Sequence, residues 1–349
     1  MELSQLVRRE WPEPPPGHFA APTIGLPTQS TLRALHTELE VWAGGDASAP
    51  GYDTAVERCR ELYAKLVGVP GEWVAVGNQV SVWAGLVAAA LPDGADVVVP
   101  AGDFSSVVYP FLVHADRGVR VRHVPLAELA DAVRTETTLV AYSLAQSATG
   151  EVADADAVRD AATAAGALTM CDVTQAAGWL PVDASRFDIT VCGGYKWLCH
   201  PRGTAFLTVR PERLDWLRPL YAGWYAGESR WDSIYGPEMQ LASTAQRFDI
   251  SPAWHCWVGA VPALELFTSV PPAEVYAHDS ALADLLRKRV GADPTGSAIV
   301  TLPDPEGSAA EKLRAAGCAV SARAGNVRLG FHLWNTEADV DLAVAALQG

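Results

Sequence analysis

The stretch "VCGGYKWLCHPRG", residues 191–203, places Lys196 among apolar, aromatic and glycine residues. Ammonium groups are rarely buried unless they are paired. A dry, apolar site lowers the pKa of a lysine toward the neutral form, which can attack a carbonyl group. A predicted strand at 167–172 ends on Asp172, and Gln175 follows three residues later. The sequence therefore offers an amine nucleophile and a carboxylate at the ends of two strands.

These two groups match the needs of pyridoxal phosphate chemistry. This cofactor requires a lysine for its Schiff base and an acid beside its pyridine nitrogen, so that the ring can accept electrons. Each residue also has an ordinary structural interpretation. Lys196 could reach water along an apolar surface, and Asp172 could cap a turn.

Short β-branched runs alternate with helical patterns between residues 50 and 210, a pattern typical of a parallel sheet with helices on both faces. Ligands of such sheets bind at the carboxyl ends of the strands, where Asp172 and Lys196 are expected. Helices are predicted at 81–91 and 154–166. Strands are predicted at 73–77, 96–100, 119–124, 139–144, 167–172, 188–193 and 204–209.

The remainder of the chain divides into a loop and a smaller unit. Residues 211–250 lack clean periodicity and are expected to form a long ordered loop, and residues 251–270 are helical in pattern. An N-terminal arm at 1–20 is expected to pack on the small domain, with a large domain at 21–270 and an α+β domain at 271–349. Within the small domain we predict helices at 280–291, 309–317 and 335–347 and strands at 297–302, 318–322 and 327–333.

Composition excludes several classes of partner. The chain has 349 residues, 49% of them hydrophobic, and a formal net charge of −15, which disfavours nucleic acid and anionic membranes. No secretory signal or membrane-spanning run is evident, so a cytoplasmic location is expected. The cysteines lack disulfide or metal-ligand spacing and are expected to be buried free thiols, with no metal site: Cys59, Cys171, Cys192, Cys199, Cys256 and Cys318.

Residues 171–210, "CDVTQAAGWLPVDASRFDITVCGGYKWLCHPRGTAFLTVR", carry four short motifs in order. They are Asp-x-x-Gln, Gly-x-x-Pro-Val-Asp, a strand that leads to Tyr-Lys, and Pro-x-Gly-x-x-Phe-Leu. This span resembles the core of the class V aminotransferase family of fold-type I pyridoxal phosphate enzymes. The resemblance implies an α/β fold with a large domain around a mostly parallel mixed sheet and a small C-terminal α+β domain.

The resemblance also implies roles for individual residues around the cofactor. Lys196 would form the Schiff base and later carry protons, while Asp172 would pair with the pyridine nitrogen. Gln175 would bond the phenolic oxygen of the cofactor. Tyr195 replaces a histidine that many members have before the lysine, and Phe104 is the candidate for stacking on the ring. Phe104 could instead belong to the core.

Four further roles follow from the resemblance. Val80 and Ser81 open a helix whose free N–H groups and dipole would hold the phosphate, although Ser81 could simply cap the helix. Gln146 would lie near the substrate and the phenolic oxygen of the cofactor, or else be a solvated loop amide. Arg328 would bind the substrate α-carboxylate, or else lie exposed on an edge strand. Ser251 aligns with the position that reaches the neighbouring subunit's phosphate, which implies a homodimer with shared active sites.

The sequence indicates the cofactor more clearly than it indicates the reaction. Desulfurases of this family carry a nucleophilic cysteine on a loop shortly before the equivalent of Arg328, whereas Cys318 is expected on a strand followed by a short loop. Persulfide chemistry is therefore disfavoured. Transamination, β-elimination and epimerisation all begin with removal of the Cα proton by Lys196. The residues expected to shape the substrate pocket lie in loop 221–247: Trp224, Tyr225, Trp231 and Tyr235.

We therefore predict a pyridoxal phosphate enzyme acting on an α-amino acid, with aminotransferase activity favoured. A carbon–sulfur lyase, a kynureninase-like hydrolase or an epimerase are alternatives within the same fold, and Tyr195 and Phe104 point mildly to the kynureninase-like group. A nucleotide-binding protein without this cofactor is disfavoured, because "VGNQVSVW" lacks the G-x-G-x-x-G spacing.

Overall fold

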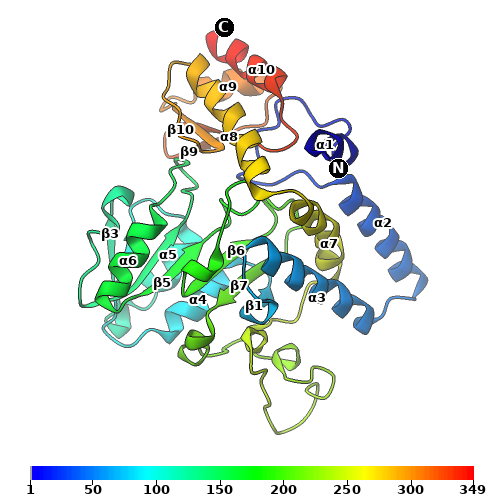
Figure 1. Ribbon diagram of the computed structural model, residues 1–349, viewed down its shortest axis with the longest axis vertical. Coiled ribbons are helices and arrows are strands. Elements are labelled where there is room, and N and C mark those ends of the chain that lie inside the picture. Colours follow the sequence, from blue (N-terminus) through cyan, green and yellow to red (C-terminus); the bar gives the residue numbers. More distant parts are fainter. Residues whose placement is uncertain (1) are drawn as a thin grey trace.

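A seven-stranded sheet forms the centre of the larger part of the molecule (Figure 1). The computed structural model describes residues 2–349. Strand β7 runs antiparallel to both of its neighbours, and the other strands are parallel to one another. This arrangement confirms the predicted mostly parallel mixed sheet. In spatial order the strands are β1 (Val74–Gly77), β7 (Ala205–Val209), β6 (Ile189–Gly193), β5 (Leu168–Asp172), β4 (Thr137–Ser143), β2 (Asp96–Pro100) and β3 (Arg120–Val124).

Helices cover both faces of this sheet because alternate strand residues are apolar on opposite sides. Val97 and Val99 belong to a core cluster with helices α4 (Val80–Ala90) and α5 (Ser105–Leu112). Val98, between them, belongs to the cluster on the other face. The helices of that face are α3 (Ala49–Leu66), α6 (Ala155–Ala165) and α7 (Trp254–Ser269).

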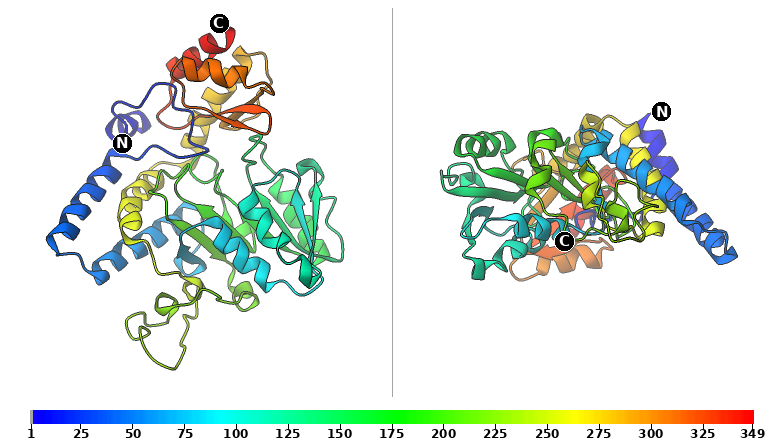
Figure 2. Two further views of the ribbon diagram at one scale, coloured as in Figure 1. Left: turned by 180° about the vertical axis from the view of Figure 1, so that it is seen from behind. Right: turned by 90° about the horizontal axis from the view of Figure 1, so that it is seen from below.

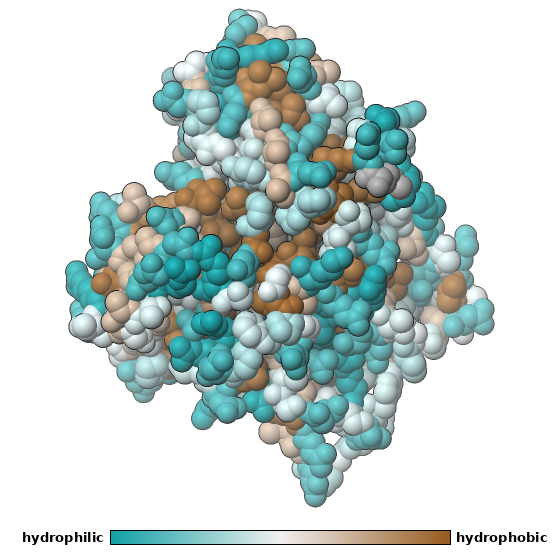
Figure 3. All heavy atoms as spheres, in the orientation of Figure 1, coloured by the Kyte–Doolittle hydropathy of each residue, from teal (hydrophilic) through white to brown (hydrophobic). Residues whose placement is uncertain are grey.

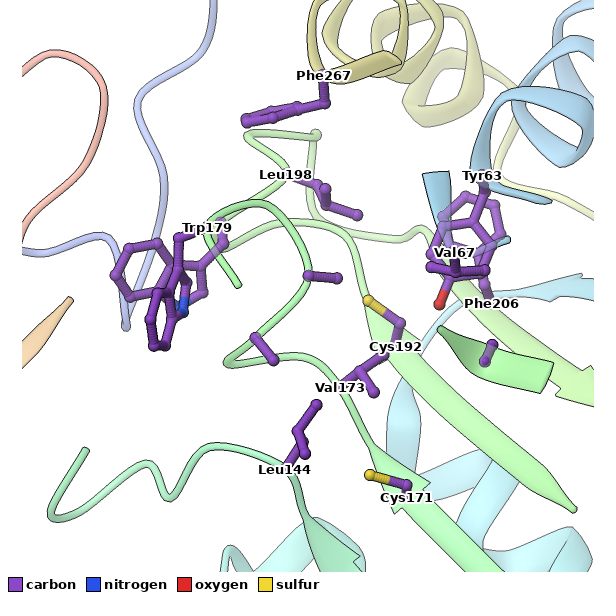
Figure 4. Packing of buried hydrophobic residues seen from close by; sticks show 14 of the residues in the cluster. Tyr63, Val67, Leu144, Cys171, Val173, Trp179, Cys192, Leu198, Phe206 and Phe267 are labelled. Atoms are coloured by element: carbon purple, nitrogen blue, oxygen red, sulfur yellow. The ribbon is translucent and has the colours of Figure 1, made fainter. Parts of the chain in front are cut away.

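The core on the second face reaches the strands that carry the predicted chemistry. Tyr63 of α3 stacks on Phe206 of β7, with 3.9 Å between the ring centroids. Figure 4 shows this pair together with two cysteines of the same core cluster, Cys171 on β5 and Cys192 on β6. All six cysteines are free and five are buried, as predicted. The ends of β5 and β6 are therefore anchored in a rigid core.

The small domain is built on a three-stranded antiparallel sheet in the order β8 (Ile299–Pro303), β10 (Asn326–Gly330) and β9 (Ser321–Arg323). Helices α8 (Pro272–Arg289), α9 (Ser308–Ala315) and α10 (Glu337–Gln348) accompany it. Thr336 and Asp339 form a capping box at the start of α10. Helix α8 begins earlier than the predicted residue 280, because Pro272 occupies its first turn, where proline is well tolerated.

The N-terminal segment touches both parts of the molecule. Helix α1 (Leu3–Glu10) is followed by Trp11, which joins the core of the larger part. Farther along, the Phe19 amide donates to the Ala319 carbonyl over 3.0 Å, and the Gly330 amide donates to Phe19 over 2.8 Å. Residues 17–20 thus lie against the small sheet, while α1 packs elsewhere. The three domain boundaries remain predictions.

Two features extend away from the sheet. Helix α2 (Gln29–Gly44) packs against α7 and then projects from the body (Figure 2). Residues 211–250 form the predicted long loop, which contains short 3-10 helices at Pro211–Trp216, Trp224–Ala226 and Ala245–Phe248. This loop lies at the end of the molecule opposite the small domain.

The surface is mixed in polarity, and apolar side chains gather where the small domain meets the large one (Figure 3). Within the described residues 2–349, no helix combines the length and apolar character needed to cross a membrane.

Candidate active site

A cavity of about 260 Å³ lies beyond the carboxyl ends of β1, β2, β5 and β6. This is the place where sheets of this type bind ligands. Residues from five separate segments form its lining: Asn78, Gln79, Val80, Ser81, Phe104, Ser106, Asp172, Thr174, Tyr195, Lys196, Arg202 and Gly203. Six predicted site residues therefore meet in one cavity: Val80, Ser81, Phe104, Asp172, Tyr195 and Lys196.

Lys196 is 6% exposed, and its Nζ lies 5.0 Å from the centroid of the Phe104 ring and 5.6 Å from that of Tyr195. Burial lowers the pKa of this amine to about 8, although the charge of Asp172 opposes the change. Just before Lys196, the backbone at Gly194 passes close to the His200 ring. A Cβ at this position would lie 2.2 Å from that ring, so glycine is required here. The amine is thus held in a dry site, where a substantial neutral fraction exists near pH 8.

Asp172 is the last residue of β5 and is 5% exposed. Burial raises the pKa of its carboxyl group to about 6, against the effect of the Thr174 hydrogen bonds and the Lys196 charge. The Thr174 amide donates to Asp172 Oδ1 over 2.8 Å. Thr174 Oγ1 accepts a hydrogen bond from the Gly193 amide at 2.9 Å, which ties the loop after β5 to the end of β6. Asp172 is therefore fixed in position and mostly ionised at neutral pH.

The start of α4 forms the wall that is suited to an anion. Its N-cap residue Gln79 makes no side-chain capping bond, so the first backbone N–H groups of the helix have no side-chain acceptor there. Val80 and Ser81 line the cavity at this point. An eleven-residue helix with its amino end toward a cavity favours a bound phosphate.

Phe104 lines the cavity and is 42% exposed, so the alternative that it belongs to the core is wrong. It is the N-cap residue of α5. Asp103 holds this segment, because its carboxylate accepts the Phe104 amide at 2.6 Å and the Ser143 amide at 2.8 Å. Sequence analysis missed Asp103, although an acidic residue just before a helix is a recognisable start signal.

Arg328 is 1% exposed and lies on β10, the central strand of its sheet, so the edge-strand alternative is wrong. Its guanidinium donates to the hydroxyls of Ser147 (2.9 Å), Thr23 (3.0 Å) and Ser321 (3.2 Å). No carboxylate forms an ion pair with it among residues 2–349. Burial, reinforced by the charge of Arg323, lowers its pKa to about 10. A buried cation with only neutral partners is prepared for an anionic ligand.

Five predicted site residues lie outside the lining of this cavity: Gln146, Gln175, Trp224, Ser251 and Arg328. The Gln175 amide donates to the Pro22 carbonyl at 2.9 Å, and its oxygen accepts the Trp197 indole N–H at 2.8 Å. Gln146 donates to the Ser143 carbonyl at 3.0 Å and to Asp103 at 3.2 Å, so the alternative of a solvated amide is wrong. Ser251 is exposed, before α7. The predicted roles of these residues remain predictions.

The aromatic residues of loop 221–247 that were predicted to shape the substrate pocket do not line the cavity of the single chain. Trp224 packs on Tyr225 and Trp231, with ring centroids 5.1 and 5.3 Å apart. Tyr225 is buried and donates to Asp53 at 2.8 Å, and Tyr235 is exposed. The loop lies against α3 instead, held by the ion pairs of Arg230. Its side chains therefore serve packing in the single chain.

Cys318 lies in a different place from the one predicted. It precedes β9 instead of belonging to a strand, and it is buried against Gly17 of the N-terminal segment. Strands β9 and β10 are joined by the short turn Ala324–Gly325, where both residues have positive φ. This turn leaves no loop that could carry a cysteine nucleophile directly before Arg328.

The other lining residues were not predicted as site residues, although Arg202 and Gly203 lie in the Pro-x-Gly-x-x-Phe-Leu motif. Arg202 and Gly203 close the wall near Tyr195, with the Arg202 guanidinium carbon 5.1 Å from the Tyr195 ring centroid. Thr174 and Ser106 belong to turns next to predicted residues. The signals available in the sequence were this motif and the proximity of these residues to Asp172, Phe104 and Lys196.

Comparison with known proteins places the chain in a family. The family model described as Aminotransferase class-V matches residues 48–310. The chain therefore belongs to the class V aminotransferase family, whose cofactor is pyridoxal phosphate. The cavity fits this cofactor, because a buried lysine, a buried carboxylate, an exposed aromatic ring and an uncapped helix start surround a single space.

Individual relatives within this family have different activities. The chain is 30% identical over 232 residues to the uncharacterized aminotransferase YcbU of Bacillus subtilis, covering 64% of this chain and 61% of that protein. It is 27% identical over 275 residues to isopenicillin N epimerase of Streptomyces clavuligerus, covering 71% and 67%. The solved structure of the cystine C–S lyase C-DES is similar in fold, with a TM-score of 0.86 at 19% identity over 95% of this chain and 97% of that one.

Proposed function

We propose that this chain acts on an α-amino acid by removing its Cα proton with Lys196, and that the outcome is transamination. The observation that carries the proposal is the Lys196 amine, buried in a cavity beside Asp172 and the ring of Phe104. The relative YcbU supports transamination by name only.

The residues of the chain divide the work. Lys196, Asp172, Phe104 and the start of α4 would hold pyridoxal phosphate, which when bound supplies a ring that stabilises negative charge at Cα. Arg328 would bind the α-carboxylate, since its buried charge has only neutral partners. Lys196 Nζ, with a pKa lowered to about 8, would accept and return the proton close to neutral pH.

The cofactor assignment is tested by borohydride reduction of the purified, cofactor-loaded protein. We expect visible absorbance from lysine-bound pyridoxal phosphate, and a reduced adduct on the peptide that contains Lys196 by mass spectrometry. The Lys196→Ala variant serves as the control and should show neither. Absence of an adduct on Lys196 in the wild type would overturn the proposal.

The reaction is tested with a panel of amino acids, with and without a keto-acid acceptor. A transaminase requires the acceptor and transfers the amino group to it. Release of a keto acid without an acceptor, or racemisation of the substrate, would contradict transamination while leaving Cα chemistry intact.

A carbon–sulfur lyase is the second candidate. The short β9–β10 turn removes the loop that a persulfide-forming cysteine would need, and a β-eliminating enzyme has no need of such a cysteine. The similarity to C-DES supports the fold required for this reaction. Release of cysteine persulfide, pyruvate and ammonia from cystine without an acceptor would favour this candidate.

We also propose that the chain acts as a homodimer. Helix α5, beside the cavity, exposes large apolar side chains at Phe104, Tyr109 and Leu112, and the projecting helix α2 exposes Leu39 and Trp42. A second copy of the chain would cover such surfaces. Light scattering of the purified protein should give twice the chain mass of 37.1 kDa, and a monomer at micromolar concentration would contradict the proposal.

A further inference from the structure

The inner face of the β9–β10 hairpin carries a second arginine near Arg328. Val327 and Leu329 point into the core of the small domain, so the alternate residues Asn326 and Arg328 point to the other face. Arg328 reaches Ser147 and Thr23 of the large part from this face. Its side of the hairpin therefore faces the large part of the molecule.

The pairing register places Arg323 on the same face as Arg328. Ser321 is opposite Arg328, and Arg323 is opposite Asn326. Arg323 and Arg328 are thus diagonal neighbours on adjacent strands, a relation in which Cβ atoms lie about 7–8 Å apart. The hydrogen bond from Arg328 Nε to Ser321 Oγ, at 3.2 Å, confirms the common face.

Arg323 lacks an anionic partner. Across the part of the chain that the structure describes, it takes part in no ion pair, and its guanidinium donates only to the carbonyl of the adjacent Ala322 at 2.8 Å. The chain has 41 acidic and 26 basic residues, so a partner was readily available to evolution. Two arginines that form no ion pair with a carboxylate in the described residues are thus neighbours on one face of the hairpin.

The charge of Arg323 acts on the site itself. Its repulsion is one cause of the lowered pKa of Arg328 and contributes to the lowered pKa of Lys196. Like charges placed together destabilise the free protein, so an arrangement of this kind is best explained by a ligand that brings negative charge.

We propose that Arg323 selects amino acids with a second anionic group, a carboxylate or an oxidised sulfur group, on the side chain. The inference rests on the proposed function, in which Arg328 takes the α-carboxylate. Arg323, exposed at the edge of the hairpin, then receives the second anion two or three bonds from Cα. A planar guanidinium suits both kinds of oxyanion because it can donate two parallel hydrogen bonds.

Binding without reaction gives the first test. Succinate and butyrate have the same carbon skeleton and differ by one carboxylate, and neither has an amino group that could react. By calorimetry, the cofactor-loaded wild type should bind succinate about 10- to 100-fold more tightly than butyrate. Arg323→Gln should abolish the difference and leave butyrate binding unchanged, while Arg323→Lys should keep part of it.

The matched control is Arg314→Gln, which removes an exposed arginine of α9 in the same domain without changing the site. It should bind both acids like the wild type. Equal affinity of the wild type for succinate and butyrate, an unchanged preference in Arg323→Gln, or failure to bind succinate at all would each overturn the inference.

Turnover separates this inference from the proposed function. Aspartate and glutamate should be converted with at least about tenfold higher kcat/KM than asparagine and glutamine, and Arg323→Gln should remove that preference. Conversion of the amides as well as the acids would overturn the role of Arg323 and leave the Cα chemistry standing. If no amino acid of either kind is converted, the proposed function itself fails, and the inference fails with it.

Discussion

The buried carboxylate of Asp172 should destabilise the protein when the cofactor is absent. Burial raises its pKa from 3.8 to about 6, which corresponds to about 3 kcal/mol of unfolding free energy. Because the pKa is higher in the folded protein, the folded state holds this proton more tightly than the unfolded chain does. The resulting contribution to the unfolding free energy is fully present below pH 3.8 and is lost as the pH rises through about 6. The conversion already includes the attraction of the Lys196 charge, which opposes the shift.

Asp172→Asn removes the charge but keeps an oxygen that can accept the Thr174 amide. The cofactor-free variant should therefore be about 3 kcal/mol more stable than the wild type at pH 7, and roughly half of this advantage should remain at pH 5. Urea denaturation at both pH values measures the difference. In the cofactor-loaded enzyme the same variant should lose activity, since an amide cannot stabilise a protonated ring nitrogen.

The control is Asp93→Asn, because the Asp93 side chain is 79% exposed and pairs only with Arg117 at the surface. Its stability relative to the wild type should hardly change between pH 5 and pH 7. If Asp172→Asn were no more stable than the wild type at pH 7, or if its advantage were the same at both pH values, the assignment of Asp172 as a destabilising buried charge would be refuted.

Three other substitutions test separate parts of the structure. Arg328→Gln should raise KM for the amino acid by about 10- to 100-fold, and an unchanged KM in steady-state kinetics would contradict its role. Asp249→Asn breaks the buried ion pair with Arg60, 2.6 Å long, and should lower the unfolding free energy by about 3–5 kcal/mol; a loss below about 1 kcal/mol in urea would argue against it. Gly25→Ala places a Cβ 2.1 Å from the Lys196 carbonyl oxygen and should cost about 1–3 kcal/mol, accompanied by weaker cofactor retention on dialysis. Full retention with wild-type stability would show that this contact is easily relieved.

The sequence was sufficient for the sheet because the strands of a doubly covered parallel sheet are short apolar runs. Each predicted strand of the large part lies within three residues of an observed one, from β1 at Val74 to β7 at Val209. Asp172 and Lys196 were found because both follow such a run, and the geometry of parallel strands brings their ends to one edge. Arg328 was found by resemblance alone, since its burial depends on the packing of two domains.

The walls of the cavity could not be predicted in the same way. Thr174 and Arg202 line it through turns whose conformation is set by tertiary contacts. The amides of Gln146 and Gln175 are directed by Asp103, Pro22 and Trp197, which lie far away in sequence.

One short N-terminal segment positions both halves of the candidate site. The Pro22 carbonyl accepts the Gln175 amide, and Thr23 Oγ1 accepts Arg328 at 3.0 Å. Two residues farther on, the Gly25 amide donates to the Tyr195 carbonyl at 3.1 Å, directly before Lys196. Arg328 and Lys196 lie in different parts of the molecule, yet both are held by residues 22–25. The distance between them therefore depends on this short segment, so a change in it should alter substrate fit and cofactor retention together.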